Sequence, residues 1–106
     1  MSFDIPETMT AIEITEVGGP EVLKTASLPV PQPAAGEMLV RNAAIGVNFP
    51  DTMQRRGGYP PPPGTTDIPG LELAGTVVAT GDCVSRHTLG DEVCALVSGG
   101  AYAEYT

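Results

Sequence analysis

The stretch MLVRNAAIGVNFPDTMQRRGGYPPPPG, residues 38–64, carries three different backbone signals in succession. Its first part, residues 38–47, is an apolar run interrupted only by Arg41 and Asn42, as is typical of a strand covered on both faces. Its last part, residues 60–63, is four prolines, each of which fixes φ and lacks an N–H donor. The stretch therefore predicts a strand that leads through a short element into a stiff, extended connection.

The short element between these two parts has the signals of a helix. Pro50 suits the first helical position, and Asp51 would face the positive end of the helix dipole. Arg55 falls in the last turn, and Gly57 can adopt the left-handed conformation that ends a helix. The sequence predicts one helix from Pro50 to Arg56.

The rest of the chain reads as short strands separated by glycine and proline turns. Gly75 lies inside one of these strands, where a bulge or a close backbone approach is expected. The total of six or seven strands predicts a mainly β fold with one or two short helices, arranged as a small, partly open β-barrel. The additional strands are expected over residues 10–16, 22–28, 71–80, 93–97 and 101–105.

Composition narrows the class of protein. The chain has 106 residues, of which 42% are hydrophobic and 17% charged, enough apolar material for one folded domain, residues 1–106. A net charge of −8 disfavours nucleic acid as a partner. No apolar run approaches the roughly 18 residues that a membrane span requires, and the acidic N-terminus is unlike a secretion signal. We expect a cytoplasmic protein in which Cys83 and Cys94 are reduced packing residues.

Asn48 and Tyr59 are the first candidates for a functional site. A hydride-transfer site needs neutral groups that orient a cofactor and a substrate, because the cofactor carries the chemistry. Asn48 could instead cap the helix, and Tyr59 could instead pack beside the prolines. Asp51 could accept a hydrogen bond from a ribose or simply complement the helix start.

Other polar residues have simpler interpretations. Arg55 and Arg56 could steer a phosphate, but a pair of arginines on a short helix is more often a solvated helix end, which is what we expect. His87 has no catalytic partner at a telling local distance, and Glu72 is expected to support a loop through hydrogen bonds. No G-x-G-x-x-G or Walker motif occurs, so the chain has no recognisable phosphate-binding loop of its own.

Four segments together carry a family resemblance: GGPEVL at 18–23, AIGVNFPDTMQRRGGYPPPPG at 44–64, PGLELAGTVVATG at 69–81, and GDEV at 90–93 with GGAYAEY at 99–105. From about residue 9 to residue 106, the chain resembles the zinc-free, zeta-crystallin-like quinone oxidoreductases of the medium-chain dehydrogenase/reductase superfamily. The resemblance implies the N-terminal, GroES-like catalytic domain of such an enzyme. The Rossmann domain that binds NADPH would lie outside this chain, so the isolated chain is expected to be inactive.

The resemblance also implies residue roles. Asn48 corresponds to the asparagine beside the nicotinamide, with Phe49, Asp51 and Thr52 in the same cofactor-facing loop. Tyr59 matches the tyrosine that lines the substrate cleft. The full-length parent would be a homodimer.

The resemblance further argues against a catalytic metal. Zinc-dependent relatives have a cysteine where this chain has Asn48, and a histidine where it has Leu71 before Glu72. An amide and an alkyl side chain are poor or incapable zinc ligands. Without a Lewis acid, the implied substrates are small molecules that accept reducing equivalents readily, namely quinones or activated enones.

Two other functions stay open at this stage. The same superfamily includes enzymes that reduce enoyl thioesters, and the cleft residues do not exclude such a substrate. A stand-alone, co-chaperonin-like GroES module has a similar fold and length, and it would assemble into a ring.

Overall fold

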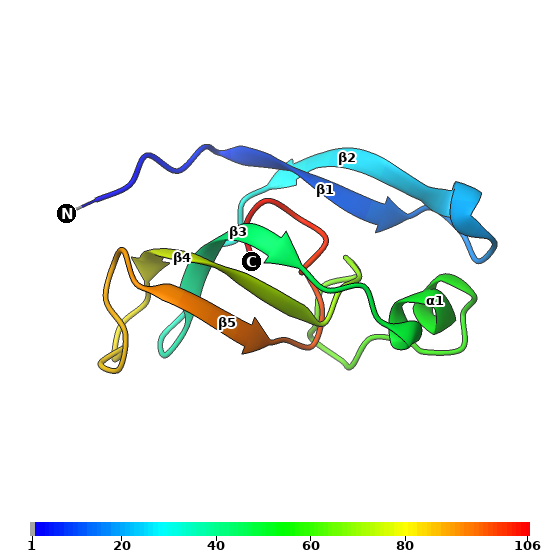
Figure 1. Ribbon diagram of the computed structural model, residues 1–106. Helices are drawn as coiled ribbons and strands as arrows, with labels where there is room; N and C mark the ends of the chain where they lie inside the picture. Colours follow the sequence, from blue (N-terminus) through cyan, green and yellow to red (C-terminus); the bar gives the residue numbers. More distant parts are fainter. Residues whose placement is uncertain (1) are drawn as a thin grey trace.

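The computed structural model describes residues 2–106, which form five strands, one α-helix and one turn of 3-10 helix (Figure 1). In chain order, these elements are β1 (Thr8–Ile14), η1 (Pro20–Val22), β2 (Leu23–Pro29), β3 (Met38–Ile45), α1 (Phe49–Arg55), β4 (Glu72–Thr80) and β5 (Glu92–Leu96).

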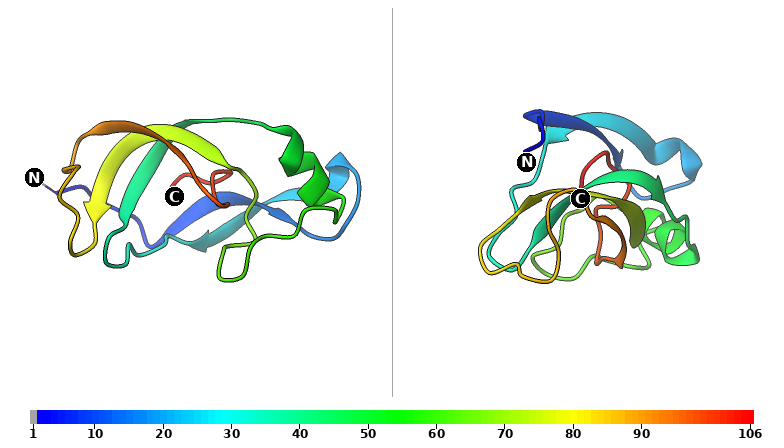
Figure 2. Two further views of the ribbon diagram at one scale, coloured as in Figure 1. Left: turned by 90° about the horizontal axis from the view of Figure 1, so that it is seen from below. Right: turned by 60° about the vertical axis from the view of Figure 1, so that its left-hand side comes forward.

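The strands form two antiparallel sheets. One sheet pairs β1 with β2, and the other has the order β3-β4-β5. Figures 1 and 2 show the β1-β2 ribbon lying over the three-stranded sheet, with the C-terminal segment between them. The core that joins the two layers takes buried side chains from both sheets and the C-terminal segment, including Met9, Leu39, Val78 and Tyr105.

Strand β3 is less covered than its apolar sequence predicts. Leu39 and Val40 are buried, but Ala43, Ala44 and Ile45 are exposed. The expectation of a strand covered on both faces was therefore wrong for its second half. Leu39 and Val40 each belong to a buried core cluster, whereas residues 43–45 belong to neither.

Gly75 is confirmed as a point of close backbone approach in β4. It pairs with Asn42 at a register irregularity of β3, and a Cβ at this position would collide with the carbonyl group of Arg41. A glycine is required here because any side chain would push the two strands apart.

The C-terminal residues do not form the strand predicted over 101–105. They make isolated bridges instead, Ala11 with Ala103 and Arg41 with Tyr105. The segment passes between the two sheets and hydrogen-bonds to each, because Ile12 N–H donates to the Tyr102 carbonyl at 2.8 Å and Val40 N–H to the Thr106 carbonyl at 2.7 Å. The count of six or seven strands was consequently too high.

The helix runs from Phe49 to Arg55, so it begins and ends one residue earlier than predicted, while the predicted left-handed cap at Gly57 is confirmed. Gly57 has φ +84°, and its N–H donates to the Gln54 carbonyl at 3.0 Å, as expected for a left-handed residue after a helix. The fold class is confirmed as mainly β with one short α-helix and one 3-10 turn, although the two sheets do not close into a barrel. No helix within residues 2–106 is long and apolar enough to cross a membrane.

Candidate functional site

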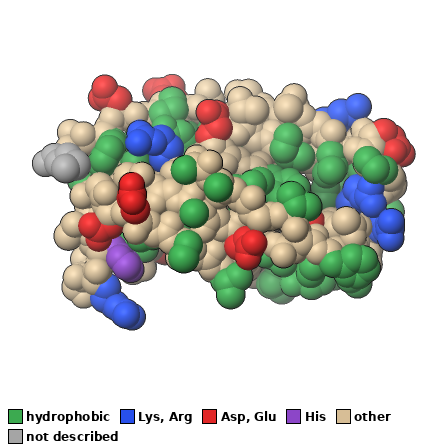
Figure 3. Space-filling model, viewed as in Figure 1, with side chains coloured by type: hydrophobic (Ala, Val, Ile, Leu, Met, Phe, Trp, Pro, Cys, Tyr) green, Lys and Arg blue, Asp and Glu red, His purple; other side chains and the backbone are tan. Residues whose placement is uncertain are grey.

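The loop that enters α1 presents both polar and apolar side chains. Asn48 is the N-cap residue, with an extended backbone at φ −127° and ψ 158°, and its side chain is half-buried. Its neighbours Val47 and Phe49 are 77% and 71% exposed. In Figure 3, hydrophobic side chains gather at the end of the molecule where α1 lies. The loop thus combines an amide with a bare apolar surface.

Asp51, in contrast, points inward and is only 6% exposed. Its Oδ2 atom accepts a hydrogen bond from the Asn48 backbone N–H at 3.0 Å and another from the Tyr102 hydroxyl at 2.7 Å. A carboxylate that accepts from the N-cap residue stabilises a helix start. The same oxygen therefore fixes the Asn48 backbone and ties it to the C-terminal segment.

Tyr102 is held by its own backbone contacts. Its N–H donates to the Pro69 carbonyl at 2.9 Å, and its carbonyl accepts from Ile12. Its ring lies where a Cβ on Gly70 would stand, and Gly70 has φ +106°. Burial of the phenol, its hydrogen bond to Asp51 and the negative charge of Asp51 all raise the pKa of the Tyr102 hydroxyl well above its usual value. Tyr102 is consequently a donor to Asp51 over the physiological pH range.

The other end of α1 is anchored to two further segments. The Gly18 N–H donates to the Arg55 carbonyl at 3.0 Å, and the Gln54 amide donates to the Asp67 carbonyl at 3.3 Å. Arg55 is only 7% exposed, so the expectation of a solvated end was wrong for this residue. The turn that contains Gly18 packs against the end of the helix, whereas Arg56 is exposed as expected.

The remaining predicted site residues lie on the surface of this region. Thr52 is half-buried, and its hydroxyl donates to the Phe49 carbonyl at 2.7 Å. Tyr59 is half-buried at the start of the proline segment, which carries no helix or strand and turns where Thr65 N–H donates to the Pro62 carbonyl at 3.0 Å.

A hollow of about 490 Å³ opens at the foot of the Asn48 loop. Ile45 and Gly46, which lead into the loop, form part of its wall, together with Glu72 and side chains of β4 and β5. Tyr59 does not line this hollow. Gly46 N–H donates to the backbone carbonyl of Glu72 at 3.2 Å, so Glu72 supports the loop through its main chain.

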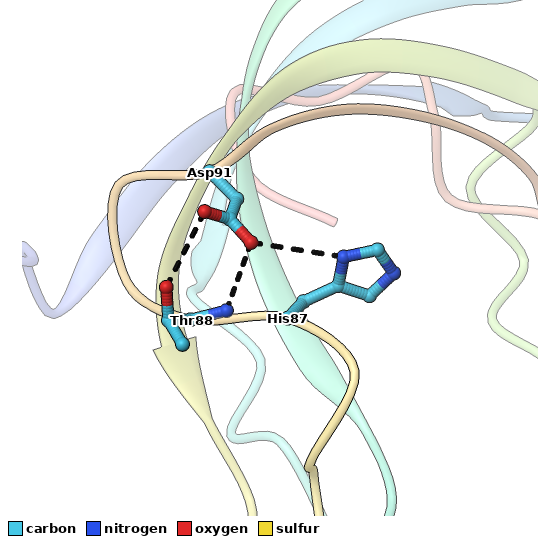
Figure 4. Close-up of polar contacts among 3 residues, drawn as sticks. All are labelled: His87, Thr88 and Asp91. Atoms are coloured by element: carbon cyan, nitrogen blue, oxygen red, sulfur yellow. Dashed lines mark hydrogen bonds and ion pairs between the residues drawn. The ribbon is translucent and has the colours of Figure 1, made fainter.

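Two further sequence interpretations need correction. Cys83 and Cys94 are both free and exposed rather than packing residues. Cys83 lies in a turn with φ 67°, and Cys94 lies on the edge strand β5. His87 does have a local carboxylate, because its Nδ1 atom lies 3.8 Å from Asp91 Oδ2 (Figure 4). That carboxylate also accepts from the Thr88 N–H at 3.0 Å, which is a turn contact.

Across residues 2–106, no group of three or more His, Cys, Asp or Glu side chains is arranged to hold a metal ion. The residue of this region that the sequence interpretation did not single out is Tyr102, which hydrogen-bonds to Asp51. It occurs in the GGAYAEY segment, but 51 positions separate it from Asp51, so no spacing rule could join them.

Comparison with known proteins identifies this architecture. Residues 34–106 match the model of the alcohol dehydrogenase GroES-like domain. The chain therefore belongs to the GroES-like domain family of alcohol dehydrogenases.

Within that family, the chain is similar to quinone oxidoreductases. It is 46% identical over 100 residues to the quinone oxidoreductase of Lama guanicoe, a match that covers 92% of this chain and 30% of the relative. It is 39% identical over 98 residues to the mouse synaptic vesicle membrane protein VAT-1 homolog-like, covering 92% and 24%.

A solved structure agrees with these sequence matches. The Escherichia coli quinone oxidoreductase complexed with NADPH superimposes with a TM-score of 0.83 at 42% identity, covering 92% of this chain and 30% of that protein. The chain thus spans about a quarter to a third of the length of these relatives.

Proposed function

We propose that residues 1–106 are the N-terminal, substrate-side domain of a zinc-independent oxidoreductase that transfers reducing equivalents from NADPH to quinone-like acceptors. The observation that carries the proposal is the Asn48 loop, where a half-buried amide stands between two exposed apolar side chains, Val47 and Phe49. Similarity to proteins named quinone oxidoreductase supports the same reaction.

The loop residues fit the nicotinamide end of a dinucleotide. An amide can both donate to and accept from the carboxamide of a nicotinamide, and apolar side chains can cover the flat ring. We propose that the loop of Asn48, Phe49, Asp51 and Thr52 faces the cofactor, with Asp51 supporting the loop from inside, and that Tyr59 borders the acceptor cleft. The phosphates of NADPH would be bound by a Rossmann domain outside these 106 residues, because this chain has no glycine-rich phosphate loop.

In this proposal, NADPH supplies the reducing equivalents. The chain's own residues orient the nicotinamide and shield the reacting groups from water. Asn48 holds the nicotinamide in one orientation, which lowers the entropic cost of reaching a reactive geometry. The exposed apolar groups of the loop exclude water once the cofactor and acceptor cover them. Asn48 and Leu71 offer no zinc-binding thiolate or imidazole, so acceptors that need no Lewis acid, such as quinones or enones, suit the site.

A chimera tests this proposal directly. The corresponding N-terminal segment of the E. coli quinone oxidoreductase would be replaced by this chain, which is 42% identical to it. We expect NADPH-dependent quinone reduction that persists in the presence of a chelator. Asn48→Ala should lower kcat/KM by about tenfold or more, because an orienting contact is lost.

The matched control is Gln32→Ala, which removes an exposed amide far from the loop in sequence. It should leave kcat/KM unchanged. A chimera that needs added zinc, or one in which Asn48→Ala keeps the full kcat/KM, would contradict the proposal. Reduction of an enoyl thioester in preference to quinones would point to another branch of the superfamily.

The proposal extends to the setting of the parent protein, for which we expect a cytoplasmic homodimer. Native mass spectrometry of the 106-residue chain separates this from a co-chaperonin-like module. A monomer or dimer agrees with the reductase domain, whereas a closed ring of seven copies would replace it with the chaperone function.

A further inference from the structure

We propose that Tyr102 is a positioning residue for the Asn48 loop and that it acts through Asp51. The inference rests on the proposed function for the purpose of the loop, and on this structure alone for the coupling. It assigns Asp51 an internal role, with a buried side chain that contacts Asn48 and Tyr102, and it adds a residue from the far end of the chain to the site.

The geometry of the Asp51 carboxylate carries the inference. Both donors, the Asn48 backbone N–H at 3.0 Å and the Tyr102 hydroxyl at 2.7 Å, converge on the single atom Oδ2. The second oxygen, Oδ1, is buried and has no hydrogen-bond partner among the described residues. With a 6% exposed side chain, Asp51 has little surface to offer a cofactor. Its two contacts instead set the direction in which the backbone leaves β3 and enters α1.

Tyr102 is suited to this role because its own place is fixed. Hydrogen bonds link its backbone to Pro69 and to Ile12 of β1, and its ring fills the space that Gly70 leaves open. The hydroxyl is therefore presented to Asp51 from a residue whose backbone is hydrogen-bonded on both sides. A short hydrogen bond to a carboxylate is stronger than one between neutral groups. The position of the Asn48 loop thus depends on the layer between the two sheets.

The helix has other anchors, but they lie at its opposite end. Gly18 contacts the carbonyl of Arg55, and Gln54 contacts that of Asp67. These contacts can keep α1 attached while its first turn moves. Loss of the Tyr102 hydroxyl should therefore loosen the Asn48 loop locally, without unfolding the helix or the sheets.

Amide hydrogen exchange measured by NMR on the 106-residue chain tests the coupling. In Tyr102→Phe, which keeps the ring, the Asn48 amide should exchange about tenfold faster or more, the ratio expected for a lost hydrogen bond to a charged group. The amide of Val77, a fully buried residue of β4 whose N–H donates to the Asp91 carbonyl at 2.9 Å, serves as the reference for opening of the sheet in the same sample. It should change much less than Asn48.

The matched control is Tyr105→Phe, three positions along the same segment, whose ring belongs to the core between the sheets. It should leave the exchange of Asn48 unchanged relative to that of Val77. Equal acceleration of Asn48 and Val77 in Tyr102→Phe would show a merely structural hydrogen bond and would overturn the inference.

Two variants of Asp51 sharpen the test. An amide has one acceptor oxygen, and both donors use one oxygen, so Asp51→Asn can still serve Asn48 and Tyr102. Asp51→Ala cannot. We expect Asp51→Asn to preserve most of the protection of the Asn48 amide and Asp51→Ala to lose it; equal loss in both variants would contradict the convergent geometry.

These measurements need no cofactor and no turnover. If Asn48 responds to Tyr102 but the chimera reduces no quinone, the positioning contact stands and the proposed function falls. If the chimera is active but the exchange rate of the Asn48 amide is unchanged in Tyr102→Phe, the proposed function stands and the positioning role of Tyr102 falls.

Discussion

The sheet region and the α1 region of this molecule arrange their side chains in opposite ways. In the sheets, apolar groups such as Leu73 and Val77 are 4% and 0% exposed. Around α1, the apolar Val47 and Phe49 are 77% and 71% exposed, whereas the charged Asp51 and Arg55 are 6% and 7% exposed. The usual distribution of polar and apolar residues is thus inverted at one end of the molecule.

The difference teaches where this fold is stabilised and where a ligand can act. Burial of apolar area stabilises the sheets, a contribution that needs no particular direction. The α1 region depends on a few directed hydrogen bonds, and it leaves its apolar groups for something else to cover. Exposed apolar groups beside a polar side chain are typical of binding sites.

Truncation of a core side chain should destabilise the sheet region and produce the largest change in the free energy of unfolding. Leu73→Ala should lower the free energy of unfolding by about 2–5 kcal/mol, since it removes buried methyl groups and leaves a cavity. Urea unfolding followed by circular dichroism measures the change. The control is Leu96→Ala on the neighbouring strand β5, which is 84% exposed and should stay within about 0.5 kcal/mol of the wild type.

Equal losses in the two leucine variants would mean that Leu96 of β5 is covered in solution by another segment or another molecule. The exposed apolar side chains of the molecule would then not be confined to the α1 region, and the comparison between the two regions would have to include β5.

An intermediate effect should come from alkaline pH, through Tyr102. The pKa of its hydroxyl is raised in the folded state, so its contribution to stability is fully present below the ordinary tyrosine pKa of about 10. That contribution is lost as the pH rises from there through the folded-state value. The free energy of unfolding should therefore fall more steeply above pH 10 in the wild type than in Tyr102→Phe.

Urea unfolding between pH 8 and pH 11 measures this slope. Tyr105→Phe should behave like the wild type, because it retains the Tyr102 contact with Asp51. A slope that is the same in Tyr102→Phe and in the wild type would remove Tyr102 as the source of the pH dependence.

The smallest effect is expected at the β4–β5 turn, where the contact between His87 and Asp91 lies outside both regions. His87 and Asp91 are 42% and 43% exposed at 3.8 Å, and exposed pairs contribute little. His87→Ala should change the free energy of unfolding by less than about 0.5 kcal/mol. Asp91→Ala should cost about 1 kcal/mol, since it also removes the acceptor of the Thr88 N–H.

If His87→Ala proves as costly as Asp91→Ala, the pair is stronger than its exposure suggests. Thermal unfolding at low and high salt would then show whether charge attraction is responsible.

Local sequence signals predicted much of the fold correctly. Alternating apolar residues predicted the approximate positions of the strands. Pro50 and Gly57 predicted the helix and the left-handed residue after it, and Gly75 predicted the close approach between β3 and β4. These signals work because each depends on the backbone preference of one residue or on a period along one element.

The sequence by itself therefore determined the mainly β class and the helix after residue 48, and its motifs indicated the family. Only the tertiary structure decided that Asp51 and Arg55 are buried, that the C-terminal segment bridges two sheets instead of forming a strand, and that Tyr102 reaches Asp51. Burial and contact between residues 51 positions apart depend on how whole layers pack. No local propensity contains that information, because it arises only when separate elements meet.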